Sequence, residues 1–239
     1  MSSQPNATAQ TEDFEFAALN EAVNYRAALL EEFGQHLQGR VLEVGAGIGQ
    51  FSGELRVLPG IAQLLSVEPE PQFCAEFRRR CPQLELLQGT VGDLPPGTAW
   101  DAVLSINVLE HIESDEHELS AYGRLLQPAR GTLCLFVPAR PEIYAPIDRD
   151  FGHFRRYTKP ELKRKLERAG FELVSIRYYN FAGYLAWWLN FCVLGKRGFD
   201  VGSVRFFDRI IFPSMHFCES KMCAPPIGQS LIVVARAKA

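Results

Sequence analysis

The stretch that decides the fold is Val41-Leu42-Glu43-Val44-Gly45-Ala46-Gly47-Ile48-Gly49. Its first residues form an apolar run typical of a buried strand, and the loop after it has glycine at every second position. Glycine allows a tight turn and lets a ligand approach the backbone. We therefore predict a strand, a ligand-binding loop and the start of a helix, in that order.

Outward from this motif, short apolar runs alternate with helical patterns. We predict strands at 40–44, 61–68, 84–88, 101–106, 131–137, 171–179 and 229–237. We predict helices at 16–37, 50–57, 71–80 and 115–126, the last capped by Ser114, and one more from the Thr158/Glu161 capping box to Gly170. Such alternation predicts an α/β fold: a Rossmann-like three-layer sandwich with a seven-stranded, mostly parallel sheet whose last strand is antiparallel.

The length of 239 residues fits one domain better than two. Residues 1–13 are polar and are expected to form a flexible tail, so the domain spans 14–239. An aromatic-rich insertion of residues 181–226 is predicted between the last two strands. It continues a run in which seven of fourteen residues, 178–191, are aromatic. We expect it to form an apolar pocket wall or lid, although plain core packing is an equal alternative.

Composition limits the partners. A net charge of -3 offers no basic face for nucleic acid. Six cysteines without a close CxxC pair indicate reduced thiols, and no secretory signal opens the chain, so a cytoplasmic location is expected. The uncharged run 178–195 is interrupted by Asn180, Gly183 and Asn190, so no transmembrane segment is predicted, while peripheral contact with a lipid-borne substrate stays open.

The loop differs from a dinucleotide fingerprint, because its third glycine comes one residue early. Glu43 adds a negative charge that would repel a diphosphate and suit an ammonium group. Glu68 ends the next strand, where a carboxylate can accept hydrogen bonds from both ribose hydroxyls. Asp93 follows the third strand and can accept the adenine amino group. This pattern favours S-adenosylmethionine (SAM) over a nicotinamide dinucleotide.

The sequence also resembles the class I SAM-dependent methyltransferases, in their small-molecule, ubiquinone-methyltransferase-like branch. The resemblance covers about residues 24–237 and rests on the loop at 43–49, Glu68, Asp93, the segment 101–112 and Gly152-His153-Phe154-Arg155-Arg156-Tyr157. It implies that Asn107 lies beside the methionine moiety of SAM, with Glu110 and His111 behind it. The expected cofactor-binding residues are Glu43, Gly45, Ala46, Gly47, Gly49, Glu68, Pro69, Asp93, Leu94 and Asn107.

Several residues are candidates for the acceptor side. His153 is the first candidate for a general base; Tyr157, Asp148 and Asp150 are others in the loop after the fifth strand, although a structural turn would also explain this element. Tyr25, Tyr178 and Tyr179 are candidates for contact with a substrate or with the sulfonium. The spacing of His216, Cys218 and Cys223 matches no common zinc site, so no metal is expected.

The leading hypothesis is methyl transfer from SAM to a small, aromatic or lipophilic metabolite, with S-adenosylhomocysteine as product and a place in secondary metabolism. A second hypothesis uses the same pocket for cyclisation, in which the SAM amino group attacks its own γ-carbon and releases methylthioadenosine. A third is a SAM-binding protein without catalysis. The acceptor and the oligomeric state are not determined by the sequence.

Overall fold

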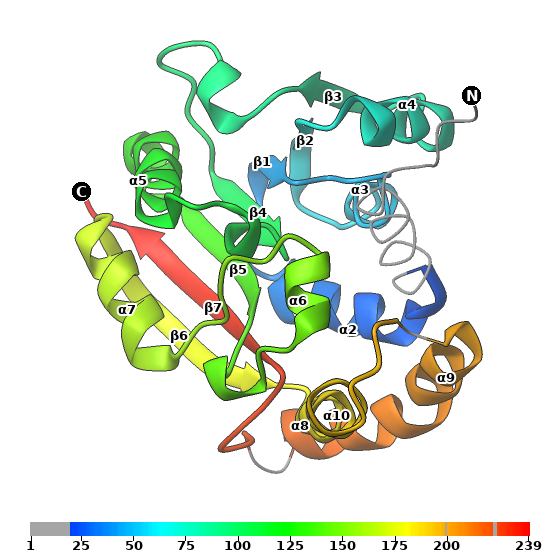
Figure 1. The fold of residues 1–239 in the computed structure, drawn as a ribbon. Coiled ribbons are helices and arrows are strands. Elements are labelled where there is room, and N and C mark those ends of the chain that lie inside the picture. The colour runs from blue at the N-terminus through cyan, green and yellow to red at the C-terminus, as the bar shows by residue number, and fades with distance from the viewer. Residues whose placement is uncertain (1–19, 199, 222–223) are drawn as a thin grey trace, which may run out of the picture.

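The computed structural model describes residues 20–198, 200–221 and 224–239, and its centre is one seven-stranded sheet (Figure 1). The strands lie in the order β3-β2-β1-β4-β5-β7-β6. Their bounds are β1 Gly39–Val44, β2 Ile61–Glu68, β3 Glu85–Gln88, β4 Ala102–Ile106, β5 Thr132–Pro138, β6 Phe171–Tyr179 and β7 Ser230–Ala237. β1 pairs in parallel with β2 and β4, whereas β7 runs antiparallel between β5 and β6. The predicted sheet, including its antiparallel last strand, is confirmed.

Helices cover both faces of this sheet and extend beyond one end of it. The α-helices are α2 Val23–Gly34, α3 Ser52–Leu55, α4 Pro71–Arg80, α5 Asp115–Leu126, α6 Pro146–Asp150, α7 Lys159–Arg168, α8 Phe181–Trp187, α9 Val201–Phe206 and α10 Phe212–Lys221. Two π-helical segments, η5 Trp188–Val193 and η6 Phe207–Ile211, continue α8 and join α9 to α10.

The core has two halves because successive strand residues point to opposite faces. Leu42 of β1 packs in one cluster with Tyr122 of α5 and Leu162 of α7. Its neighbour Val41 packs in the other cluster with Phe33 of α2. The result is the predicted three-layer sandwich, with α5 and α7 on one face and α2 on the other.

Several helix predictions need correction. The predicted helix at 16–37 is observed as Val23–Gly34, with residues 16–19 outside the described part of the chain. The helix at 50–57 shortens to Ser52–Leu55, and Ser114 begins α5 without a side-chain cap. Thr158 does accept a hydrogen bond from the Glu161 amide, and Gly170 has a φ of +86° after α7. The tail boundary at residue 13 lies outside the described residues and stays a prediction.

The insertion folds into helices packed beside the carboxyl end of the sheet, at the lower right of Figure 1. Two buried carboxylates attach it. Asp208 of η6 accepts hydrogen bonds from the amides of Asn24 and Tyr25 in the first turn of α2, at 3.0 and 2.9 Å. Glu219 of α10 accepts hydrogen bonds from the amides of Asn180 and Phe181 at the start of α8. Both helix starts are thus capped by distant side chains.

Candidate active site

The glycine loop after β1 has the backbone conformation that its glycines allow. Gly45, Gly47 and Gly49 have φ values of +73°, +54° and +84°, which side chains with a Cβ rarely adopt. A Cβ on Gly45 would lie 2.2 Å from Cγ2 of Val108. The Gly45 and Ala46 amides donate to the Val67 carbonyl, which holds the loop over the end of β2. The loop therefore packs directly against the segment that follows β4.

Glu43 lies buried beneath this loop. Its carboxylate accepts hydrogen bonds from the hydroxyls of Ser52, at 2.5 Å, and Ser66, at 2.7 Å. Burial raises the pKa of Glu43 to about 7; the two serine hydrogen bonds oppose this shift, and the nearby charge of Glu68 adds to it. A cation that approached the loop would favour the charged form of this carboxylate.

Glu68 connects the end of β2 to the glycine loop. It is buried, and its two oxygens accept hydrogen bonds from the Gly47 amide at 2.8 Å and the Glu70 amide at 3.0 Å. Pro69, which lies between Glu68 and Glu70 in the sequence, is exposed. The carboxylate is therefore fixed at the carboxyl edge of the sheet, as a ribose-binding role requires, although that role stays a prediction.

Asp93 has a local partner. It lies in the short helix η1, Val91–Asp93, and accepts hydrogen bonds from the Thr90 amide at 2.8 Å and the Thr90 hydroxyl at 3.0 Å. These hydrogen bonds hold the pKa of Asp93 below its usual value. Leu94 follows it as a buried side chain. The carboxylate thus stabilises its own turn, and contact with adenine stays a prediction.

Asn107 is the point where the glycine loop meets a large cavity. It follows β4 with a φ of +52°, and its amide donates to the Phe136 carbonyl at 2.9 Å. Its neighbour Val108 is the residue that packs against Gly45. Asn107 itself lines the cavity. The end of β4 therefore lies between the predicted cofactor loop and the space beyond it.

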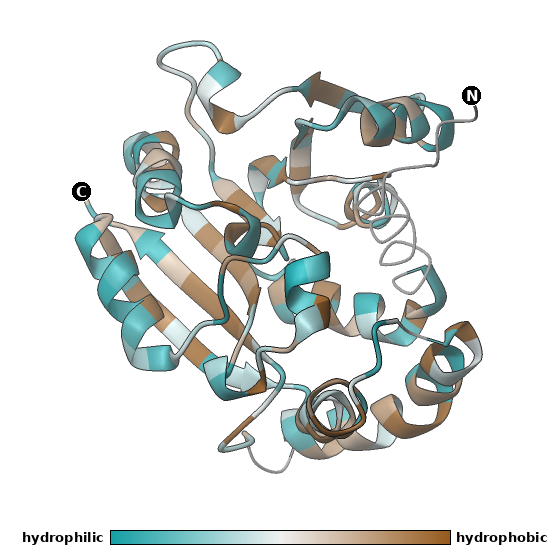
Figure 2. Ribbon diagram, viewed as in Figure 1, coloured by the Kyte–Doolittle hydropathy of each residue, from teal (hydrophilic) through white to brown (hydrophobic). Residues whose placement is uncertain are grey.

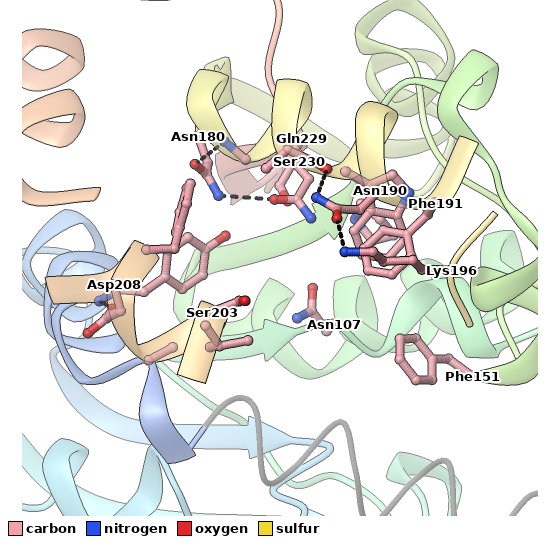
Figure 3. Close-up of a pocket in the computed structure, with 18 of the residues that line it drawn as sticks. Asn107, Phe151, Asn180, Asn190, Phe191, Lys196, Ser203, Asp208, Gln229 and Ser230 are labelled. Carbon is pink, nitrogen blue, oxygen red and sulfur yellow. Dashed lines mark hydrogen bonds between the residues drawn. The ribbon is translucent and has the colours of Figure 1, made fainter. Parts of the chain in front are cut away.

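The cavity has a volume of about 1000 Å³ and lies between the sheet edge and the insertion. Aromatic rings line much of it: Phe136, Phe151, Trp187, Phe191 and Phe207. Polar side chains at its wall are bonded to one another, as Figure 3 shows for Asn180 with Gln229 and for Lys196 with Asn190, at 3.0 and 2.7 Å. The cavity is thus mostly apolar with a few fixed polar groups, which is typical of small-molecule sites.

His153 is among the residues that line this cavity, and its ring is held through Nδ1. Nδ1 lies 3.1 Å from Oδ1 of Asp148, which also accepts from Nε of Arg156 at 2.8 Å. Burial would raise the pKa of Asp148, but the His153 hydrogen bond and the Arg156 charge bring it below its usual value. His153 is buried, and its Nε2 has no hydrogen-bond partner among the described residues. Asp148 therefore orients the ring and leaves Nε2 for another group.

Of the other predicted acceptor-side residues, only Tyr25 lines the cavity. Burial raises the pKa of Tyr25 well above its usual range, although hydrogen bonds with Ser230 and Asn180 oppose the shift. Its hydroxyl therefore stays protonated at neutral pH and can act only as a neutral hydrogen-bonding group.

The other three predicted tyrosines are not part of the cavity wall that the described residues form. Tyr157 is buried, and its hydroxyl donates to Asp115 at 2.9 Å and to the Leu109 carbonyl. Tyr178 and Tyr179 point to opposite faces of β6 and join different core clusters. Asp150 also has another partner, an ion pair with Arg197.

The donor atoms of Glu110, His111 and His153 all lie within 4.8 Å of one another and are the group in the described chain that could hold a metal ion. His216, by contrast, stacks on Phe212 and has its Nδ1 3.4 Å from the Tyr179 hydroxyl. Cys218 is an exposed free thiol, and Cys223 lies outside the described residues.

Sequence reasoning missed the residues that hold the cavity together. Asp208 caps α2 and Glu219 caps α8. Arg156 links Asp148 to the insertion, because its Cζ lies 4.3 Å from the centre of the Trp187 ring. Asn180 has a φ of +62° and accepts from the Gly183 amide to begin α8. The Asn-Phe-Ala-Gly sequence is a local capping signal that could have indicated this helix start. The long-range caps have no comparable local signal.

The cavity and loop can be compared with known proteins. The family model described as "Methyltransferase domain" matches residues 15–176. A Mycolicibacterium smegmatis protein named probable S-adenosylmethionine-dependent methyltransferase is 28% identical over 136 residues, 56% of this chain and 52% of that protein. A Mycobacterium tuberculosis protein with the same name is 27% identical over 139 residues, 57% of this chain and 50% of that protein. The chain spans about half the length of the curated relatives it matches.

Solved structures agree in fold. A chain from the complex of the Haloferax volcanii Trm112 methyltransferase activator with a methyltransferase has a TM-score of 0.64 at 17% identity, with 100% of both chains covered. The DhpI complex with S-adenosylhomocysteine has a TM-score of 0.59 at 17% identity, with 97% of this chain and 93% of that chain covered. Since the family model covers more than half of the sequence, this chain belongs to the methyltransferase-domain family of class I SAM-dependent methyltransferases.

Proposed function

We propose that the protein binds SAM along the carboxyl edge of β1, β2 and β4 and methylates an acceptor held in the cavity. The observation that supports this most is the meeting of the two spaces at one residue. Asn107 lines the cavity, while the adjacent Val108 packs on the glycine loop. A ligand on the loop and a ligand in the cavity would therefore share a boundary at the end of β4.

The residues present suit SAM. Glu68 is a fixed carboxylate for the ribose, Glu43 adds a buried carboxylate below the loop, and the glycines let the loop backbone pack closely on the end of β2 and on Val108. A buried acid whose pKa is raised to about 7 by burial is stabilised by a neighbouring ammonium and disfavours a diphosphate. When bound, SAM supplies an electrophilic methyl group on a positive sulfur.

The acceptor is proposed to be a small, aromatic or lipophilic molecule. Aromatic side chains of β5, the α6 end and the insertion would contact its apolar part, represented by Phe136, Phe151 and Trp187. Asn180 and Gln229 would contact a polar part. Alignment of an acceptor with the donor group can lower the activation free energy by roughly 7 to 11 kcal/mol when the geometry is favourable.

His153 is proposed as the proton acceptor for a hydroxyl or ammonium acceptor. Its ring is oriented by Asp148, and Arg156 keeps that carboxylate charged at neutral pH. Nε2, which has no hydrogen-bond partner among the described residues, would then take the proton that the acceptor loses. This is the arrangement in which an oriented histidine is most effective as a base.

Chromatography of the products tests the reaction. The purified protein is incubated with SAM, alone and with extracts of apolar metabolites. S-adenosylhomocysteine that forms only with extract, together with a methylated product, is expected. Enzymatic formation of methylthioadenosine without an acceptor would instead indicate cyclisation, and SAM binding without any turnover would indicate a binding protein.

A further inference from the structure

The exposed apolar side chains of the protein gather on the insertion. Of the thirteen large apolar side chains that are exposed in the described chain, nine lie between residues 185 and 217. Single exposed apolar residues are common, but a concentration on one segment marks an interaction surface. Figure 2 shows hydrophobic residues along the helices of this segment.

The apolar residues follow helical spacing. On α8 and η5, Leu185, Trp188, Leu189 and Val193 lie on one side of the helix, at 48 to 54% exposure. On the helix from α9 to α10, Phe206, Ile210 and Phe217 are 58 to 61% exposed. We name these seven residues the outer face.

The opposite side of α8 and η5 packs against the body of the protein and the cavity. Trp187 and Phe191, which lie between the outer-face residues in sequence, are buried and line the cavity. A helix that is apolar all round is normally covered on all sides. We therefore expect another molecule to cover the outer face, because no residue of the described chain covers it.

The exposed charged side chains of the insertion are mostly positive. Lys196, Arg197, Arg205 and Arg209 are exposed in the insertion, whereas Asp200 is its one exposed acid among the described residues. Arg197 and Arg205 pair with Asp150 and Glu21 of the main body. The other two acids of the insertion, Asp208 and Glu219, are buried as helix caps. With these two arginines paired, the excess of cations in the insertion is carried by Lys196 and Arg209 against Asp200, whereas the whole chain has a net charge of -3.

The outer face is continuous with the cavity. Phe206 is 58% exposed and also lines the cavity, as does Ile211, which is 36% exposed. An apolar molecule could pass from a layer against the outer face into the cavity along these two side chains. None of the helices in the described chain has the length and apolar run needed to cross a bilayer.

We propose that the outer face binds the surface of an anionic bilayer, from which a lipid-borne acceptor enters the cavity. Tryptophan and aliphatic side chains flanked by lysine and arginine suit the boundary between headgroups and acyl chains. Face-to-face contact with a second copy would bring like charges together, which disfavours that occupant. Bilayer binding stands independently; the statement about the acceptor rests on the proposed methyl transfer.

Flotation with lipid vesicles tests the first part. The full chain is mixed, without SAM, with vesicles of phosphatidylcholine plus phosphatidylglycerol or of phosphatidylcholine alone. We expect binding to the anionic vesicles, reduced at least about tenfold by Trp188→Ser/Leu189→Ser and about fivefold by Arg209→Gln. The matched control is Val57→Ser/Val174→Ser, which removes two apolar side chains that are exposed elsewhere and should bind like the unmodified protein.

A protein that binds neither kind of vesicle would overturn the proposal. The proposal would also be overturned if Val57→Ser/Val174→Ser lost as much binding as Trp188→Ser/Leu189→Ser. Light scattering tests whether a second copy of the chain binds the outer face instead. A dimer that dissociates in Trp188→Ser/Leu189→Ser would show that the outer face is a contact between copies, and this result would also overturn the proposal.

Transfer of radioactive methyl from SAM tests the second part. Label in a lipid extract supports the lipid-borne acceptor, and label only in water-soluble product rejects it while methyl transfer stands. A protein without SAM affinity that still binds vesicles would reject only the proposed function.

Discussion

His153 is the residue on which the proposed proton transfer depends. Replacing it in His153→Gln should lower kcat about 10² to 10⁴-fold, because His153 lines the cavity and its Nε2 has no hydrogen-bond partner among the described residues. SAM affinity, measured by calorimetry, should stay unchanged. His117→Gln is the control, since His117 is exposed on α5.

The Glu110, His111 and His153 group makes chelation an informative companion test. If His153 acts as a base, activity should survive exhaustive treatment with a chelator. Activity that disappears and returns with a divalent cation would instead make His153 a metal ligand.

Glu43 should make SAM binding depend on pH. Because burial raises its pKa to about 7, the free protein below that pH holds Glu43 mainly protonated. A bound cation favours the charged form, so binding releases a proton and affinity should rise as pH increases toward 7, by up to about tenfold per pH unit. Calorimetry in buffers of different ionisation enthalpy measures the proton release. In Glu43→Gln this slope should be absent, and a slope that persisted there would contradict the role.

The different surroundings of Tyr178 and Tyr179 could have been predicted from the sequence itself. Tyr178 and Tyr179 are consecutive residues of a strand, so their side chains had to point to opposite faces. They could not both line one cavity. The partners of Tyr157, in contrast, depend on how segments distant in sequence meet, as in the 42-residue separation between Tyr157 and Asp115.

At the scale of elements, the attachment of α2 to η6 should control the acceptor side. Asp208→Ala would leave the part-buried amides of Asn24 and Tyr25 without their acceptor, which lowers the free energy of unfolding by roughly 1 kcal/mol. Tyr25 would also lose its position in the cavity wall, so the KM for the acceptor should rise while SAM affinity holds. Denaturant unfolding and steady-state kinetics measure the two effects. Glu85→Ala, at an exposed strand position, should change neither.

The strands were predictable because each is a short apolar run bounded by turn residues, and the observed bounds differ from the predicted ones by at most one residue at either end. The helices of the insertion were not. Trp187 and Trp188 are adjacent, one lining the cavity and the other exposed, so hydrophobicity there carries no 3.6-residue period. Asp208 likewise gave no signal, because it lies 184 residues from Asn24.

At the scale of the whole molecule, ligand binding should appear as thermal stability. A ligand at 100 times its Kd stabilises the native state by about 2.7 kcal/mol. For a chain of this size, that corresponds to a Tm increase of roughly 5 to 10 °C. We expect S-adenosylhomocysteine to give such an increase and NAD to give none. The glycine spacing of the loop differs from that of a dinucleotide site, and the buried Glu43 would repel a diphosphate. The reverse order would contradict the proposed cofactor.

The antiparallel direction of β7 determines how the protein is best handled. Its start at Ser230 lines the cavity, and its end at Ala237 pairs with Phe171, at the far end of β6. The last residue therefore emerges away from the insertion (Figure 1). An affinity tag or a sensor-chip linkage at the carboxyl terminus would leave the cavity entrance and the helices around it facing solution, whereas one near Asn20 would start beside the glycine loop, where Asn20 bonds to Gln50.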